Sequence, residues 1–112
     1  MGRVRYQKPS SYEEMVAPCI WLADQREELQ SKIEELRRRY FDLRGDIATA
    51  RVEKRIACAG GKETDECRRA SLKLDALRAE HDGIRDDLGR CNAELIVIEL
   101  RMKKLKCEEW EE

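Results

Sequence analysis

Five cysteines are the side chains of this sequence with the widest choice of chemistry, because a thiolate can bind a metal ion or join a disulfide bond. They stand at Cys19, Cys58, Cys67, Cys91 and Cys107. No two of them form a Cys-x-x-Cys pair, and the only histidine is His81, so we expect no metal site within one chain. Disulfide bonds or buried thiols are the remaining interpretations, and the choice depends on the elements that hold the cysteines.

The residue sets of common active sites are missing from the sequence. Catalysis needs a nucleophile or an acid–base pair held in a dry pocket. The chain offers no Gly-rich phosphate loop and no Ser-His-Asp set, so we expect no enzyme activity and no cofactor. We interpret His81 as a partly exposed histidine at the edge of a core, in preference to a pH switch.

A seven-residue repeat of apolar residues organises most of the chain. One tract contains Leu22, Leu29, Leu36 and Leu43, and a second contains Leu74, His81, Leu88, Leu95 and Met102. Of the 112 residues, 42% are charged and 5% are aromatic, which leaves too little bulk for an ordinary globular core. The repeat predicts an all-α protein whose helices pack as a left-handed coiled coil.

The two tracts are separated by Gly60-Gly61, and adjacent glycines are typical of a helix end. Thr64, followed by two acids, then provides an N-cap for the next helix. We therefore predict an antiparallel helical hairpin, in which the numbers of facing coiled-coil residues sum to about 124. The alternative is one continuous helix that pairs with another chain, and it would place both glycines in a helix interior at a cost of about 2 kcal/mol.

The sequence predicts a single domain over residues 10–112, preceded by a basic, extended tail over residues 1–9. Ser11 and Glu14 match the S-x-x-E capping box, and Pro18 predicts a kink or a new helix start because proline lacks the N–H group and clashes with the preceding turn. We expect a short helix over 11–17, a helix over 18–59, a turn over 60–63 and a helix over 64–110.

The hairpin register places four of the five cysteines in two facing pairs. Cys58 faces Cys67 beside the turn, Cys19 faces Cys107 at the open end, and Cys91 takes a core position alone. Two disulfides would fix both ends of the hairpin, and a Cys19–Cys107 bond would contribute about 4 kcal/mol in the chain-entropy model. Five reduced thiols, which are normal in the cytosol, are the alternative.

A second set of apolar and small residues lies outside the heptad seam at helical spacing. A two-helix coiled coil has no need of them. We therefore predict that hairpins associate into a four-helix or larger bundle, with a homodimer favoured, or that a helix of another protein docks here. The candidate interface residues are Trp21, Phe41, Gly45, Ala48, Val52, Gly89, Ala93, Ile96, Val97, Leu100 and Trp110.

The expected function is that of a non-enzymatic structural or adaptor protein that self-associates and binds protein partners. The alternative is a nucleic-acid-associated protein that uses Arg3, Arg5 and Lys8 of the tail and the Arg-rich face of the first helix. Three charges supply only weak, salt-sensitive binding, and acids interleave with the helix arginines, so this alternative is not favoured.

Charge and hydropathy restrict the expected surroundings of the protein. The net charge of −1 gives no overall attraction to nucleic acid or anionic membranes. The longest apolar run, over residues 95–98, is far shorter than a membrane span, and the basic N-terminus lacks the apolar segment of a secretory signal. We therefore expect a cytoplasmic protein. The scarcity of Asn and Gln among many charged residues is also a tendency of thermophile proteins.

The plan of two antiparallel coiled-coil helices resembles that of prefoldin subunits and of the tRNA-binding arm of seryl-tRNA synthetases. Prefoldin subunits carry β-hairpins between their helices, and the segment from Cys58 to Thr64 is too short for them. The likeness rests on no sequence motif, so the sequence assigns the chain to no family.

Overall fold

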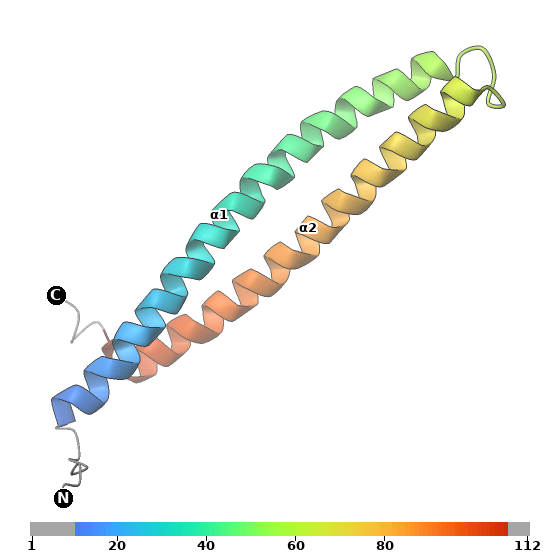
Figure 1. Ribbon diagram of the computed structural model, residues 1–112. Helices are drawn as coiled ribbons and strands as arrows, with labels where there is room; N and C mark the ends of the chain where they lie inside the picture. Colours follow the sequence, from blue (N-terminus) through green and yellow to red (C-terminus); the bar gives the residue numbers. More distant parts are fainter. Residues whose placement is uncertain (1–10, 108–112) are drawn as a thin grey trace, which may run out of the picture. The chain divides into compact units, whose positions relative to one another are not determined.

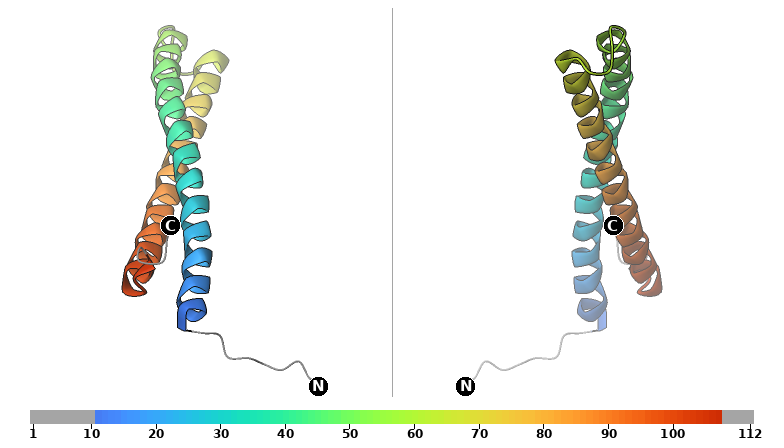
Figure 2. Two further views of the ribbon diagram at one scale, coloured as in Figure 1. Left: turned by 90° about the vertical axis from the view of Figure 1, so that its left-hand side faces the viewer. Right: turned by 90° about the vertical axis from the view of Figure 1, so that its right-hand side faces the viewer.

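The computed structural model describes residues 11–107 of the chain, and the side chains of residues 17–107. Two helices make up this part: α1, Ser11–Ala57, and α2, Asp65–Lys104. They pack against each other and run in opposite directions from the turn that connects them (Figure 1). The views of Figure 2 show the same turn, between the green end of α1 and the yellow start of α2. The predicted all-α helical hairpin is therefore confirmed.

The heptad seam is the surface along which the helices bury their side chains. In the heptad abcdefg, Leu22, Leu29, Leu36 and Leu43 occupy position d, and Leu74, His81, Leu88, Leu95 and Met102 occupy position a. With this assignment, every a and d residue from Cys19 to Ala57 and from Cys67 to Leu105 is buried or half-buried. Leu43 and Leu74 are among the most completely buried side chains. Burying one such leucine contributes about 1.5–3 kcal/mol, so the seam is the main source of stability in a chain with few aromatic residues.

α1 is one helix where the sequence predicted two. It continues through Pro18, which lies inside the helix and not at the start of a new one. A proline removes one backbone hydrogen bond and crowds only the preceding turn. Cys19 and Leu22 are buried directly after it, and their packing favours continuation of the helix. The structure therefore differs from the predicted short helix over 11–17 with a new start at Pro18. The side chains of Ser11 and Glu14, the predicted capping box, lie outside the described side chains.

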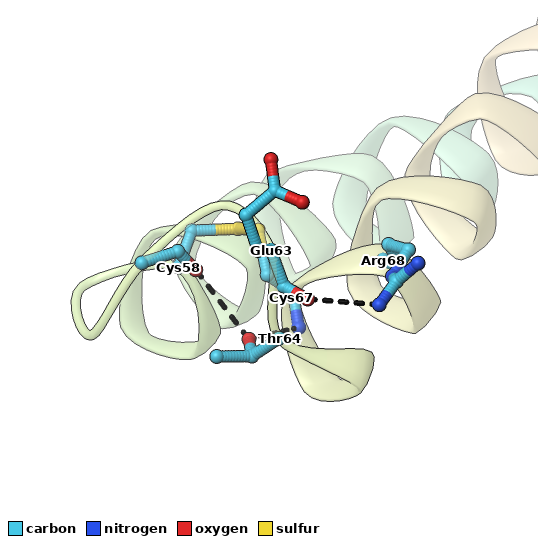
Figure 3. The surroundings of a disulfide bond; sticks show 6 residues. Cys58, Glu63, Thr64, Cys67 and Arg68 are labelled. Atoms are coloured by element: carbon cyan, nitrogen blue, oxygen red, sulfur yellow. Dashed lines mark hydrogen bonds between the residues drawn. A yellow bond between two sulfur atoms is a disulfide. The ribbon is translucent and has the colours of Figure 1, made fainter.

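The turn between the helices has the capping that the sequence predicted. The backbone N–H of Cys67 donates a hydrogen bond to Oγ1 of Thr64 at 3.1 Å, which makes Thr64 the N-cap of α2 (Figure 3). Nη2 of Arg68 donates to the carbonyl oxygen of Glu63 at 2.8 Å. Gly61 has a φ of 137°, a backbone conformation that glycine adopts far more readily than other residues. The turn is therefore fixed by its own residues.

α2 ends earlier than the predicted residue 110. After Lys104 the N–H of Leu105 still donates to the carbonyl of Arg101 at 3.0 Å, and the N–H of Lys106 donates to that of Lys103 at 3.0 Å. Lys106 then adopts a left-handed backbone with a φ of 57°. This change of direction ends the helix, and the next residue, Cys107, is buried.

The chain divides into two compact units, each with its own core. The terminal unit is Met1–Ser31 with Ala93–Glu112, and the turn unit is Lys32–Asn92. The core of the terminal unit contains Cys19, Leu22, Met102 and Cys107, with Ala23, Ile98 and Leu105 packed against it. The core of the turn unit contains Ile47, Ala50 and Leu74, with Leu77 packed against it. These last four residues are the neighbours that the predicted register pairs, so the register is confirmed there.

Candidate interaction surface

The two predicted cysteine pairs are at disulfide distance. Cys19 and Cys107 are bonded within the terminal unit, with their Cα atoms 5.4 Å apart. Cys58 and Cys67 are bonded across the turn, with their Cα atoms 4.6 Å apart (Figure 3). Both Cα separations fall within the usual range for disulfides. Cys91 is a free, buried thiol at a core position of the turn unit, as the register predicted.

Charged residues connect the helices along one flank of the turn unit. Nε of Arg39 donates to Oε2 of Glu80 at 3.0 Å, and Nη2 of Arg39 donates to the same oxygen. Nζ of Lys73 donates to Oε1 of Glu53 at 3.2 Å. The hydrogen bond to Glu80, followed by the attraction of its negative charge, raises the pKa of Arg39 above its usual value. All four residues occupy g positions, so two ion pairs connect α1 and α2 on this flank of the turn unit.

Tyr40 and His81 form a stacked aromatic pair between the helices. Their ring centroids lie 4.3 Å apart, with an angle of 22° between the ring planes. The predicted register puts Tyr40 in one layer of the seam and His81 in the next, so the stack joins two neighbouring layers. Nδ1 of His81 also lies 3.5 Å from Oδ1 of the exposed Asp82. The His81 ring is half-buried, in agreement with its interpretation as a histidine at the edge of the core.

The candidate interface residues of the described chain are all exposed. Phe41 is 76% exposed and Trp21 is 58% exposed, although both are large apolar side chains. The set divides between the two units. The turn unit carries Phe41, Gly45, Ala48, Val52 and Gly89, and the terminal unit carries Trp21, Ala93, Ile96, Val97 and Leu100. Trp110 lies outside the described residues. The set therefore comprises two surfaces, one on each unit.

Three other large apolar side chains of the described residues are exposed outside the candidate set. Ile20 precedes Trp21 in the terminal unit, and Ile56 and Leu72, which are 72% and 68% exposed, lie in the turn unit. Leu72 occupies the f position of its heptad, as do Val52 and Leu100. The exposure of Leu72 could therefore have been predicted from its heptad position.

A groove with a volume of about 370 Å³ lies between the helices of the terminal unit. Its apolar walls include Trp21 from α1 with Ala93 and Val97 from α2, and the seam residues Leu22 and Ile98 also line it. Its polar lining consists of Gln25, Glu94 and Arg101. Val97 is 50% exposed, so the groove offers apolar surface to a docking partner. An apolar groove with a few polar groups is the usual form of a helix-binding surface.

The Arg-rich face of α1 does not present uniform positive charge. A hollow on the turn unit is lined by Lys32, Glu35, Leu36, Arg38, Arg39 and Asp42, in which acids alternate with the basic residues. Arg39 is also paired with Glu80. The tail residues Arg3, Arg5 and Lys8 lie outside the described residues. No described contact therefore favours binding of a phosphate backbone.

Within residues 11–107, no group of His, Cys, Asp and Glu side chains could hold a metal ion. Within the same part of the chain, neither helix is both long and apolar enough to cross a membrane.

Comparisons with protein-family models, with curated proteins and with solved structures found no match to this chain. The fold and the exposed surfaces of the two units are therefore the basis for inferring a function.

Proposed function

We propose that this protein is a non-enzymatic structural or adaptor protein, which self-associates and binds protein partners through the apolar surface of its terminal unit. That surface comprises the groove at Trp21 and Val97 together with Ile96 and Leu100 on the outer side of α2. Helices that dock on one another bury side chains of this kind at helical spacing.

The observation that carries the proposal is the exposure of large apolar side chains on well-formed helices. Leu100 is 61% exposed, and Trp21, Ile96 and Val97 are each at least half exposed in the same unit. Single exposed leucines are ordinary on protein surfaces, but neighbouring ones indicate an interaction site. The seam already satisfies the packing of α1 against α2, so these residues have no role in closing the hairpin.

Light scattering and sedimentation of the full chain test this proposal. We expect a dimer or larger oligomer, and we expect Ile96→Glu, Val97→Glu or Leu100→Glu to raise the dissociation constant by about tenfold or more. Leu72→Glu is the matched control, because Leu72 is 68% exposed on α2 but belongs to the turn unit. We expect it to leave self-association unchanged.

Three results would contradict the proposal. The first is a chain that stays monomeric at every concentration, the second is an oligomer that is indifferent to all three terminal-unit substitutions, and the third is an oligomer that Leu72→Glu disrupts to the same extent. A mobility shift with DNA or RNA that falls with salt and is lost when residues 1–9 are deleted would instead favour the nucleic-acid alternative.

A further inference from the structure

Two opposite charges on the rim of the terminal-unit groove lie seven residues apart on the same helix. Glu94 and Arg101 of α2 both line the groove, and both are exposed. Seven residues correspond to two helical turns, or about 10 Å along the axis. Among the described ion pairs neither residue has a partner, whereas two pairs of residues at g positions of the turn unit, Arg39 with Glu80 and Glu53 with Lys73, connect the helices. The rim therefore carries a positive and a negative charge that the described chain does not neutralise.

We propose that the occupant of this groove is a second copy of the chain, bound so that α2 lies antiparallel to α2 of its partner about a two-fold axis. The inference rests on the proposed self-association and adds its orientation and its register. Under this symmetry Glu94 of each copy meets Arg101 of the other, so a single pairing gives two identical ion pairs.

The charge pattern selects the antiparallel orientation. A parallel arrangement would place Glu94 against Glu94 and Arg101 against Arg101, and like charges facing each other oppose association. In the antiparallel arrangement the two-fold axis passes between Val97 and Ile98, because these residues lie midway between the two charges. Val97 of one copy then faces Ile98 of the other. The centre of the interface is apolar and its two ends are charged, as in stable protein interfaces generally.

The same apolar groove is also suited to a helix of a different protein. Binding of such a helix would not require the groove charges to be complementary to themselves. The self-complementary spacing of Glu94 and Arg101 about an apolar centre is what favours a second copy. Trp21, on the opposite wall of the groove, adds an exposed aromatic side chain of the type that anchors interfaces.

A charge-exchange experiment on the full chain, kept without reductant, tests this arrangement by sedimentation equilibrium. Glu94→Arg alone and Arg101→Glu alone each convert both ion pairs to repulsions, so we expect each to raise the dimer dissociation constant by about tenfold or more. The double variant Glu94→Arg, Arg101→Glu restores opposite charges at both ends. We expect its dissociation constant to return to within about threefold of the original value.

Glu99→Arg is the matched control. It makes the same change of charge on an exposed residue of the same segment, but Glu99 does not line the groove. We expect it to leave the dissociation constant unchanged. Circular dichroism of every variant checks that helix content is kept. Glu94→Gln and Arg101→Gln each remove a charge without creating a repulsion, so they should raise the dissociation constant less than the charge exchanges do.

The outcomes separate this inference from the proposed function. A dimer that Leu100→Glu disrupts, but that is insensitive to the exchanges at Glu94 and Arg101, would overturn the antiparallel groove contact and leave self-association intact. Weakening by both single exchanges without recovery in the double variant would also overturn it. A full chain that stays monomeric at every concentration would overturn both proposals.

Discussion

At the scale of single residues, Lys106 is the one non-glycine residue with a positive φ in the part of the chain that the structure describes. Its φ of 57° is in the left-handed region, which costs a residue with a Cβ atom roughly 1–2 kcal/mol relative to the right-handed helix. The conformation ends α2 and is followed at once by the buried Cys107, which is bonded to Cys19. The disulfide and the burial of Cys107 therefore hold Lys106 in a conformation that it would not adopt alone.

Replacing Lys106 with glycine should stabilise the protein. Glycine adopts a positive φ without steric cost, so we expect Lys106→Gly to raise the free energy of unfolding by about 1 kcal/mol, measured by urea denaturation. Lys103→Gly is the control, since Lys103 lies inside α2 and glycine there should lower the free energy by about 1 kcal/mol. A loss of stability in Lys106→Gly would show that the left-handed conformation does not persist in solution.

Charged residues at g positions have different surroundings in the two units. In the turn unit Arg39 and Glu80 pair across the helices, as do Glu53 and Lys73. These pairs are exposed, and each such pair contributes little to stability. In the terminal unit Glu94 and Arg101 line the groove, where their charges are available to a partner. The heptad position is the same, but among the described ion pairs only the charges of the turn unit are paired across the helices.

At the scale of elements, the continuity of α1 through Pro18 is the feature that the sequence alone predicted least well. The pattern of a capping box followed by proline is typical of a short helix and a new start. In the structure the helix passes through, and Pro18 is half-buried between turns that contact the core. A proline in a helix interior costs about 3 kcal/mol, so the packing of Cys19 and Leu22 offsets a substantial penalty.

The substitution Pro18→Ala distinguishes an interior proline from one that starts a helix. Because alanine restores the missing N–H group, we expect the free energy of unfolding to rise by about 1–3 kcal/mol in thermal or urea denaturation. Gly83→Ala provides the reference, since a Cβ atom at this exposed position of α2 meets nothing within 4 Å. Its expected gain is about 1 kcal/mol. If Pro18→Ala lowered stability, Pro18 would belong to a first turn, as the sequence predicted.

At the scale of the whole molecule, the two disulfides bear on the redox conditions in which the protein works. One disulfide holds the terminal unit and the other holds the turn. The cytosol of most organisms keeps thiols reduced, whereas some thermophiles maintain disulfides there. The predicted cytoplasmic location is therefore compatible with the two disulfides if the protein comes from such a thermophile. The alternative is that the protein works in an oxidising compartment.

Mass spectrometry of the protein from its native source, alkylated without reductant, should find one free thiol and two disulfides. We expect loss of the Cys19–Cys107 bond, in the variant Cys19→Ser with Cys107→Ser, to lower the free energy of unfolding by about 4 kcal/mol. The corresponding loss for Cys58 with Cys67 should be roughly 3 kcal/mol, because its loop is shorter. Cys91→Ser is the control that leaves both bonds in place. Five alkylated thiols would refute the presence of disulfides in the native protein.

Much of the architecture could be predicted from the sequence because a hairpin has few degrees of freedom. A heptad repeat on each side of Gly60-Gly61 fixes which face of each helix is buried, and one turn then fixes the register. The pairing of Cys58 with Cys67 and of Cys19 with Cys107 follows from that register, as does the contact of Ile47 and Ala50 with Leu74 and Leu77. Periodicity along the chain carries this information by itself.

Tertiary structure decided the features that depend on packing in three dimensions. Only the folded chain shows that α1 continues through Pro18, that α2 ends at Lys104, and that Lys106 turns the backbone toward a buried Cys107. It also separates the candidate interface residues into two units, and it reveals the groove that holds Glu94 and Arg101 beside Val97. The reason is physical: local propensities differ by about 1–3 kcal/mol per residue, and burial of side chains on the neighbouring helix can offset such differences.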